Sequence, residues 1–193
     1  GTHPKWLLLG AAGAAVFLLV YIRFMGYAGD RVTAWRHPEL DPGDTGYQIL
    51  QSLYAIGSGG FFGLGPGKSR QKYLYLPFQY NDYIFAIVCE ELGLVGALGI
   101  MALFALLIFR GYRIARQAEN RFSTALAAGL ISLIAVQTIL NLCVVTNLLP
   151  STGIALPFFS YGGTALAVNL GEMGIVLNIS RSGKKRTIQE AAN

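Results

Sequence analysis

The sequence predicts an all-α fold, a polytopic bundle of membrane-spanning helices, from three observations. Hydrophobic residues make up 53% of the 193 residues and charged residues only 13%, which is about half the charged share of a soluble domain. The apolar residues are gathered in long runs rather than spread along the chain. The basic residues lie mainly at the ends of these runs.

Four apolar runs are long enough to be spans, because a helix needs roughly 17–25 mostly apolar residues to cross a bilayer. They cover residues 6–22, 83–109, 122–149 and 154–179. Residues 23–82 form a long polar loop between the first two runs, and residues 180–193 form a polar tail. We therefore predict a single membrane domain over residues 1–193.

The placement of the basic residues predicts how the spans are oriented. Four arginines lie in the short connection between the second and third runs, and four more Lys or Arg residues follow the fourth run. Short loops rich in Lys and Arg stay in the cytoplasm. Both termini and residues 110–121 are therefore expected inside, and the 23–82 loop and the 147–158 turn outside. The net charge of +5 lies at span ends, which argues against a nucleic-acid partner.

Some classes of function are excluded by residue type. The chain has two histidines, His3 and His37, and both lie in polar flanks. Neither Cys89 nor Cys143 has metal-ligand spacing. An ordinary hydrolase triad and a zinc site are therefore not supported. The chain begins without Met, and its first apolar run lacks a cleavage site of small residues, so we expect a processed product or a fragment rather than a signal peptide.

The outer loop contains a predicted short amphipathic helix. Thr45 begins a segment with the spacing of a capping box. Tyr47, Leu50, Leu53 and Tyr54 then recur at helical period. The helix is expected either to lie on the outer face of the membrane or to pack on the chain's own spans.

Glycine-rich residues 57–69 resemble a phosphate-binding loop but do not match one. A P-loop requires Gly where Phe62 stands and follows a buried strand. Glycine-rich backbone beside Lys68, Arg70 and Lys72 can still hold a diphosphate through N–H groups and charge. The alternative is a flexible loop whose cations touch lipid headgroups.

Asp82 stands where the polar loop meets the second apolar run. At that boundary a carboxylate stays charged and reaches a substrate lying in the membrane. The alternative is helix capping, in which Asn81 or Asp82 accepts a hydrogen bond from a free N–H of the second span. The cations and aromatics of residues 71–77 suit a sugar diphosphate, and they equally suit an interfacial belt.

Glu90 and Glu91 lie inside the second apolar run, where ionisable groups are costly and usually face a cavity or a partner. On a helix, Glu90 lies about 12 Å deeper than Asp82, and Glu91 lies on the opposite face. We expect at least one glutamate to pair structurally. Its partner is expected in missing sequence or near the inner surface.

Polar residues recur on single faces of the third and fourth runs. Gln137 and Asn141 are four residues apart, and Asn169 and Glu172 are three apart. Such pairs hold helices together, or else they line a hydrophilic groove.

Proline and glycine interrupt the chain between the third and fourth runs, beginning at Pro150. Broken backbone at membrane depth is tolerated only where protein or a water-filled cavity covers it. We therefore expect Ser160, Tyr161, Gly162 and Gly163 to help roof a pocket opposite Asp82, the alternative being a tight turn that starts a helix.

At these residues the chain resembles the C-terminal half of the SEDS family (shape, elongation, division and sporulation), and its pattern is most similar to the FtsW and SpoVE branch. The resemblance runs in order over nearly the whole chain. Its main segments are Gly46-Tyr47-Gln48, Gly63-Leu64-Gly65, Gln71-Lys72, Tyr75-Leu76-Pro77, Asp82-Tyr83-Ile84-Phe85-Ala86, Glu90-Glu91-Leu92-Gly93, Leu156-Pro157 and Ser160-Tyr161-Gly162-Gly163.

The resemblance implies a peptidoglycan glycosyltransferase that polymerises lipid II at the outer face of the bacterial cytoplasmic membrane and serves cell division, cell shape or sporulation. It implies a fold of roughly ten spans, of which this chain is half, so the chain alone is expected to be inactive without the missing N-terminal half. The implied partner is a class B penicillin-binding protein, which is a transpeptidase.

The family's catalytic acid matches Asp82, which is expected to be the general base of an inverting reaction. Lys68, Arg70 and Lys72, or a divalent cation (Mg²⁺ or Mn²⁺), would neutralise the departing diphosphate. Gln71 and residues 160–163 complete the expected substrate contacts, and no organic cofactor is expected.

The chain departs from the family pattern at Phe78, where Glu is usual, and at Asn81, where Thr is usual. These departures weaken the case for a second carboxylate. Two other functions share the same features: a flippase or transporter of a lipid-linked precursor, and a membrane scaffold that recruits a transpeptidase.

Overall fold

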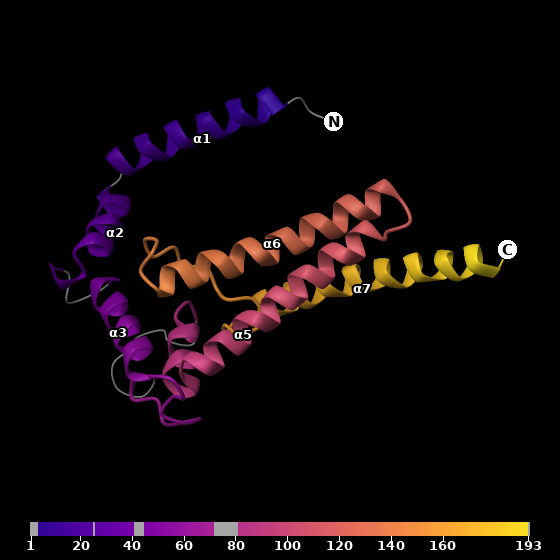
Figure 1. The fold of residues 1–193 in the computed structure, drawn as a ribbon. Coiled ribbons are helices and arrows are strands. Elements are labelled where there is room, and N and C mark those ends of the chain that lie inside the picture. Colours follow the sequence, from indigo (N-terminus) through magenta and orange to yellow (C-terminus); the bar gives the residue numbers. More distant parts are fainter. Residues whose placement is uncertain (1–3, 25, 41–44, 72–80, 193) are drawn as a thin grey trace. The chain divides into compact units, whose positions relative to one another are not determined.

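The computed structural model describes residues 4–24, 26–40, 45–71 and 81–192, and every regular element within these ranges is helical (Figure 1). This confirms the all-α fold class. The elements are α1 (Pro4–Phe24), α2 (Gly26–Arg36), the 3-10 helix η1 (Pro38–Leu40), α3 (Thr45–Ser58), α5 (Ile84–Arg116), α6 (Arg121–Val145) and α7 (Gly163–Ala192).

The chain divides into two compact units, residues 1–50 and 51–193. The first unit contains α1, α2, η1 and the start of α3. Helix α2 lies inside the stretch expected to be loop with a single short helix. Apolar periodicity does not indicate α2, because its eleven residues mix polar, charged and glycine residues without an apolar stripe.

The second unit is built on three long helices that pack against one another, α5, α6 and α7 (Figure 1). Helices α5 and α6 form an antiparallel hairpin joined by residues 117–120. Asn120 caps α6, since its side chain accepts a hydrogen bond from the backbone N–H of Ser123 (2.8 Å).

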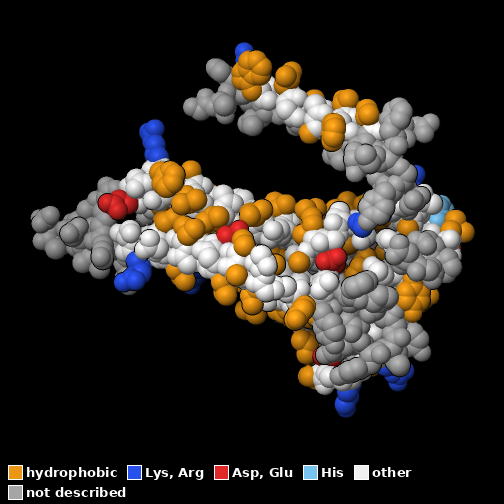
Figure 2. Space-filling model, turned by 180° about the vertical axis from the view of Figure 1, so that it is seen from behind, with side chains coloured by type: hydrophobic (Ala, Val, Ile, Leu, Met, Phe, Trp, Pro, Cys, Tyr) orange, Lys and Arg blue, Asp and Glu red, His pale blue; other side chains and the backbone are white. Residues whose placement is uncertain are grey.

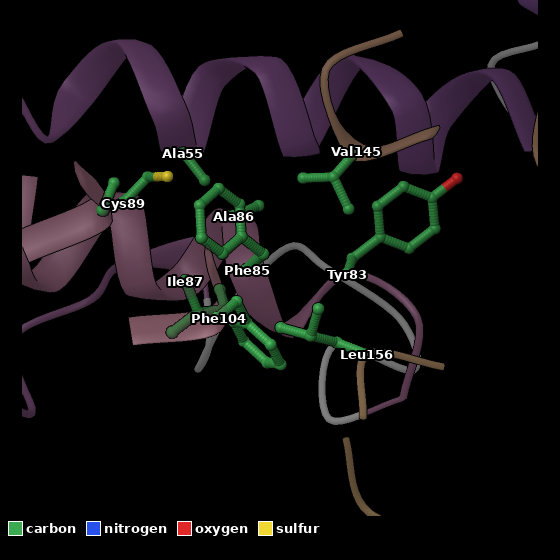
Figure 3. Close-up of a cluster of buried hydrophobic side chains, with 10 residues drawn as sticks. Ala55, Tyr83, Phe85, Ala86, Ile87, Cys89, Phe104, Val145 and Leu156 are labelled. Atoms are coloured by element: carbon green, nitrogen blue, oxygen red, sulfur yellow. The ribbon is translucent and has the colours of Figure 1, made fainter. Parts of the chain in front are cut away.

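The main core of the second unit lies at the start of α5 (Figure 3). Tyr83, Phe85 and Ala86 are buried there against Ala55 of α3 and Leu156 of the loop that precedes α7. This core brings three segments far apart in the sequence to the residues around Asp82.

Two of the described helices are long and apolar enough to cross a membrane, Ile84–Arg116 and Arg121–Val145. Only a minor share of their most apolar windows is buried inside the protein. Figure 2 shows apolar side chains spread along the surface of the long helices. Such a surface is stable where lipid replaces water. Spans at α1 and α7 stay a prediction.

Helix α6 ends at Val145, four residues before the expected end of the third span. Asn147 adopts a left-handed conformation (φ 57°). Its N–H donates to Val144 and the N–H of Leu148 donates to Cys143, at 3.0 and 2.7 Å. This is a Schellman motif with Asn in the position that Gly usually takes, and it stops the helix.

Helix α7 begins at Gly163 rather than at Ile154. Residues 150–162 form an irregular segment, hereafter the α6–α7 loop, in which Gly153 and Phe158 have positive φ angles. The hydropathy of this loop resembles that of a span, whereas its backbone conformation excludes a helix.

Candidate functional site

Asp82 is half-buried in a turn, residues 81–83, directly before α5. The N-cap of α5 is Tyr83, whose side chain makes no capping hydrogen bond. Tyr83 therefore occupies the N-cap position itself, and capping of the second span by Asn81 or Asp82 stays a prediction.

Asn141 of α6 holds this turn in place through hydrogen bonds. Its side-chain amide is fully buried. It donates one hydrogen bond to the backbone carbonyl of Asp82 (2.7 Å) and another to that of Ile154 (2.8 Å). A single side chain thus holds the Asp82 turn and the α6–α7 loop together.

Ser160 makes a second connection between the same two segments. Its hydroxyl donates to the backbone carbonyl of Asn81 (2.5 Å) and accepts from the backbone N–H of Leu156 (2.7 Å). In the described structure the Ser160 hydroxyl thus binds backbone, and its expected role in roofing a pocket opposite Asp82 stays a prediction.

The carboxylate of Asp82 faces the α6–α7 loop at Gly153. A Cβ atom built on Gly153 would lie 3.6 Å from Asp82 Oδ2. Glycine leaves that contact open. We call the 81–83 turn, Asn141, Ser160 and Gly153 the Asp82 site.

A cleft of about 460 Å³ adjoins the α6–α7 loop between α6 and α7. Its polar lining comes from Gln137, Ser160, Thr164 and Asn169. Gln137 and Asn141 therefore have different surroundings although they share a helix face: Gln137 lines the cleft and Asn141 holds the backbone.

Glu90 has structural partners at the end of the glycine-rich segment, at Ser69 and the residue that follows it. Its carboxylate accepts hydrogen bonds from the hydroxyl of Ser69 (2.5 Å) and from the backbone N–H of Arg70 (3.0 Å). The expectation of a partner in missing sequence or near the inner surface is therefore wrong. Hydropathy could not reveal the contact between Glu90 and Ser69, because that contact depends on how the loop folds back onto α5.

The glycine-rich segment also replaces backbone hydrogen bonds where α5 is broken. Gly93 has φ 66° and ψ −168°, which is not helical. Across this break, the N–H groups of Leu64 and Gly65 donate to Glu90 and Glu91, and those of Leu94 and Val95 donate to Gly60 and Phe61, at 2.9–3.2 Å. Backbone groups freed by the break are thus satisfied.

The remaining predicted site residues lie at several places. Lys68 and Arg70 have exposed side chains and Gln71 is half-buried, while Lys72 lies outside the described residues. Tyr161 is exposed, Gly162 and Gly163 adjoin the start of α7, and Pro150 is half-buried in the α6–α7 loop.

Among the described atoms, one carboxylate oxygen each of Glu91 and Glu172 is buried without a hydrogen-bond partner. Their roles stay predictions.

The described residues contain no group of three or more His, Cys, Asp or Glu that could hold a metal ion. Among the described residues of its site, Asp82 alone supplies a carboxylate. Mg²⁺ commonly binds through one or two carboxylates and substrate phosphates, so the expected cation depends on substrate oxygens.

Together, the helical fold and the two helices long and apolar enough to cross a membrane favour a helical membrane protein. The family model of FtsW, RodA and SpoVE, described as a cell cycle protein, matches residues 2–185. The chain therefore belongs to the FtsW/RodA/SpoVE family, as the sequence resemblance predicts.

Individual relatives agree with this assignment. Stage V sporulation protein E of Bacillus subtilis is 44% identical over 187 residues, covering 91% of this chain and 51% of the relative. The probable peptidoglycan glycosyltransferase FtsW of Geobacter sulfurreducens is 43% identical over 180 residues, covering 93% and 48%. The chain thus spans about half the length of the curated relatives it matches.

A solved structure shares the fold. It comes from work on the structural coordination of polymerization and crosslinking by a peptidoglycan synthase complex. The match has a TM-score of 0.73 and 27% sequence identity, and it covers 93% of this chain and 49% of the solved chain.

Proposed function

We propose that this chain is part of a peptidoglycan glycosyltransferase that polymerises lipid II into glycan strands at the outer face of the bacterial cytoplasmic membrane. The names of its relatives and its likeness to a peptidoglycan synthase chain support this class of activity. The main observation behind the proposed site is the half-buried Asp82 carboxylate. It belongs to a turn held by Asn141 and Ser160, and it faces Gly153.

In the proposed reaction Asp82 is the general base. The acceptor hydroxyl oxygen attacks the anomeric carbon of the donor, whose α-linked bond to the diphosphate breaks. The hydroxyl proton passes to the Asp82 carboxylate, and the new β-1,4 link has inverted configuration. The fixed turn supports this role, because a base must stay within hydrogen-bond reach of the proton it removes.

The cleft beside the α6–α7 loop is proposed to hold sugar. Amide and hydroxyl groups from Gln137, Ser160, Thr164 and Asn169 alternate there with apolar residues. This mixture suits a ring with hydroxyl edges and apolar faces.

Cations are proposed to stabilise the departing diphosphate. The exposed side chains of Lys68 and Arg70 project from the segment bound to Glu90, with Gln71 and Lys72 following in the sequence. Positive groups aimed at developing charge lower the barrier to its departure. No step is assigned to a metal ion.

The proposed topology has four spans with both ends of this chain in the cytoplasm, the N-terminal half of the family fold as companion, and a class B penicillin-binding protein as partner. Arg110 follows the break of α5 at Gly93 by seventeen residues, a helical rise of about 26 Å, which is close to the hydrocarbon thickness of a bilayer. With Arg110 at the inner boundary, the break lies near the outer one, and Asp82 and Glu90 precede it in the chain.

Lipid II polymerisation by the purified full-length protein with its transpeptidase tests this function. Asp82→Asn keeps the side chain's size and removes the base, so the variant is expected to fold and to make no glycan. Glu119→Gln removes one carboxylate from the α5–α6 connection and is expected to leave polymerisation unchanged.

Three results contradict parts of the proposal. Normal polymerisation by Asp82→Asn excludes Asp82 as the base. Lipid movement without polymer by the wild type favours a transporter. Polymer-free recruitment of the transpeptidase, with Asp82 dispensable, favours a scaffold.

A further inference from the structure

Glu90 is a buried carboxylate that the proposed reaction does not use. Its side chain is 1% exposed and that of Ser69 is 2% exposed. Both carboxylate oxygens are occupied, one by the Ser69 hydroxyl and the other by the Arg70 backbone N–H. A buried carboxyl group with two directed hydrogen bonds is held in one place.

The segment that Glu90 binds is also seated by backbone contacts. Cβ atoms on Gly59 or Gly63 would overlap the backbone carbonyls of Cys89 or Glu91, and one on Gly93 would overlap the backbone of Gly63. The backbone of the glycine-rich segment and that of α5 approach closely only because these residues are glycines. The glycine-rich segment therefore packs directly into the break of α5.

The side chains beside the docked backbone remain available. Lys68 and Arg70 are exposed, and neither forms an ion pair within the described part of the chain. Glu90 contacts the backbone of Arg70 rather than its guanidinium. The carboxylate thus fixes the position of these cations without neutralising them.

We propose that Glu90 is a positioning residue, which locks the Ser69–Arg70 backbone onto α5 so that Lys68 and Arg70 are held ready for the leaving diphosphate. The docking itself is independent of the activity, whereas the consequence for the diphosphate rests on the proposed function. Two separate readouts therefore apply.

The first readout is tryptic cleavage after Lys68 and Arg70 in the folded full-length protein in detergent. Glu90→Gln can keep both hydrogen bonds, since its carbonyl accepts from Arg70 and its amide donates to the Ser69 hydroxyl. Glu90→Ala keeps neither. We expect cleavage at these two sites to be at least about tenfold faster in Glu90→Ala, because protease attack follows local opening, and unchanged in Glu90→Gln.

The second readout is kcat and KM for lipid II. Misplaced groups cost up to about 100-fold in rate, so we expect kcat to fall about 10- to 100-fold in Glu90→Ala and to stay within about threefold of wild type in Glu90→Gln. Ser69→Ala, which loses one bond, should show an intermediate loss. Ser182→Ala is the control, since among the described residues the Ser182 hydroxyl bonds to the Asn178 carbonyl within its own helix turn (3.4 Å), far along the chain from the glycine-rich segment.

The outcomes separate the proposals. Unchanged cleavage in both Glu90→Ala and Ser69→Ala overturns the lock, whatever the activity. Faster cleavage with unchanged kcat overturns the link to the diphosphate.

An inactive but protease-resistant Glu90→Gln also overturns the proposal, because it shows that charge rather than position matters. If Glu90→Ala does not fold, Ser69→Ala and Glu90→Gln decide. A wild type that makes no polymer removes the proposed function and leaves the cleavage test of the lock intact.

Discussion

The side-chain amide of Asn141 donates to the backbone carbonyl of Asp82, a residue 59 positions earlier in the chain, at 2.7 Å. The same amide group donates to Ile154, 13 positions later, at 2.8 Å. The orientation of the proposed base therefore depends on a buried residue of another helix that does not itself take part in proton transfer.

Replacing Asn141 with Ala is expected to weaken both stability and activity. The carbonyls of Asp82 and Ile154 lose a buried donor, which costs about 1–3 kcal/mol each. We expect lipid II polymerisation by the full-length protein to fall about 10-fold or more, because the turn that carries Asp82 loses its support. Thr146→Ala is the control, since among the described residues the Thr146 hydroxyl bonds only within the end of α6. Equal activity of the two variants would show that Asn141 does not position the base.

Replacing Gly93 with Ala is expected to destabilise the protein by about 3 kcal/mol or more. The residue has φ 66°, and a Cβ there would overlap the backbone of Gly63. Gly99→Ala, on the same helix with open space around it, should leave the thermal midpoint in detergent nearly unchanged. Similar midpoints for both variants would mean that the docked segment and the α5 break are not formed as described.

Replacing Gly153 with Ala tests the space in front of Asp82. Both Gly153 (φ 71°) and Gly67 (φ 75°) have left-handed backbone, so alanine at either costs about 1–2 kcal/mol of strain. Only the Cβ at Gly153 lies near the Asp82 carboxylate, at 3.6 Å, while a Cβ at Gly67 meets nothing within 4 Å. We expect polymerisation to fall about 10-fold in Gly153→Ala and distinctly less in Gly67→Ala. A larger loss in Gly67→Ala would contradict this assignment.

Replacing Ala165 with Phe is expected to fill the cleft between α6 and α7. Ala165 lines the cleft, whereas the exposed Ala167 on the same helix does not. If the cleft holds sugar, Ala165→Phe should raise the KM for lipid II about 10-fold or more, and Ala167→Phe should not. A normal KM in Ala165→Phe would place the sugar elsewhere.

The class of this protein can be predicted from the sequence without any structure. Apolar runs, the scarcity of charge and the order of short motifs are local properties, so they predict helices and the family without any knowledge of contacts. The same reasoning singled out Asp82, because an acidic residue at the start of an apolar run can be recognised from the sequence alone.

The contacts that these residues make depend on how the chain folds. Hydropathy assigned residues 154–162 of the α6–α7 loop to a span, because it measures polarity and not backbone angles such as the positive φ of Phe158. It could not pair Glu90 with Ser69, or Asn141 with Asp82, since these hydrogen bonds join residues 21 and 59 positions apart. Long-range contacts depend on how helices pack and on where glycine lets two backbone segments approach closely. A local sequence pattern predicts neither.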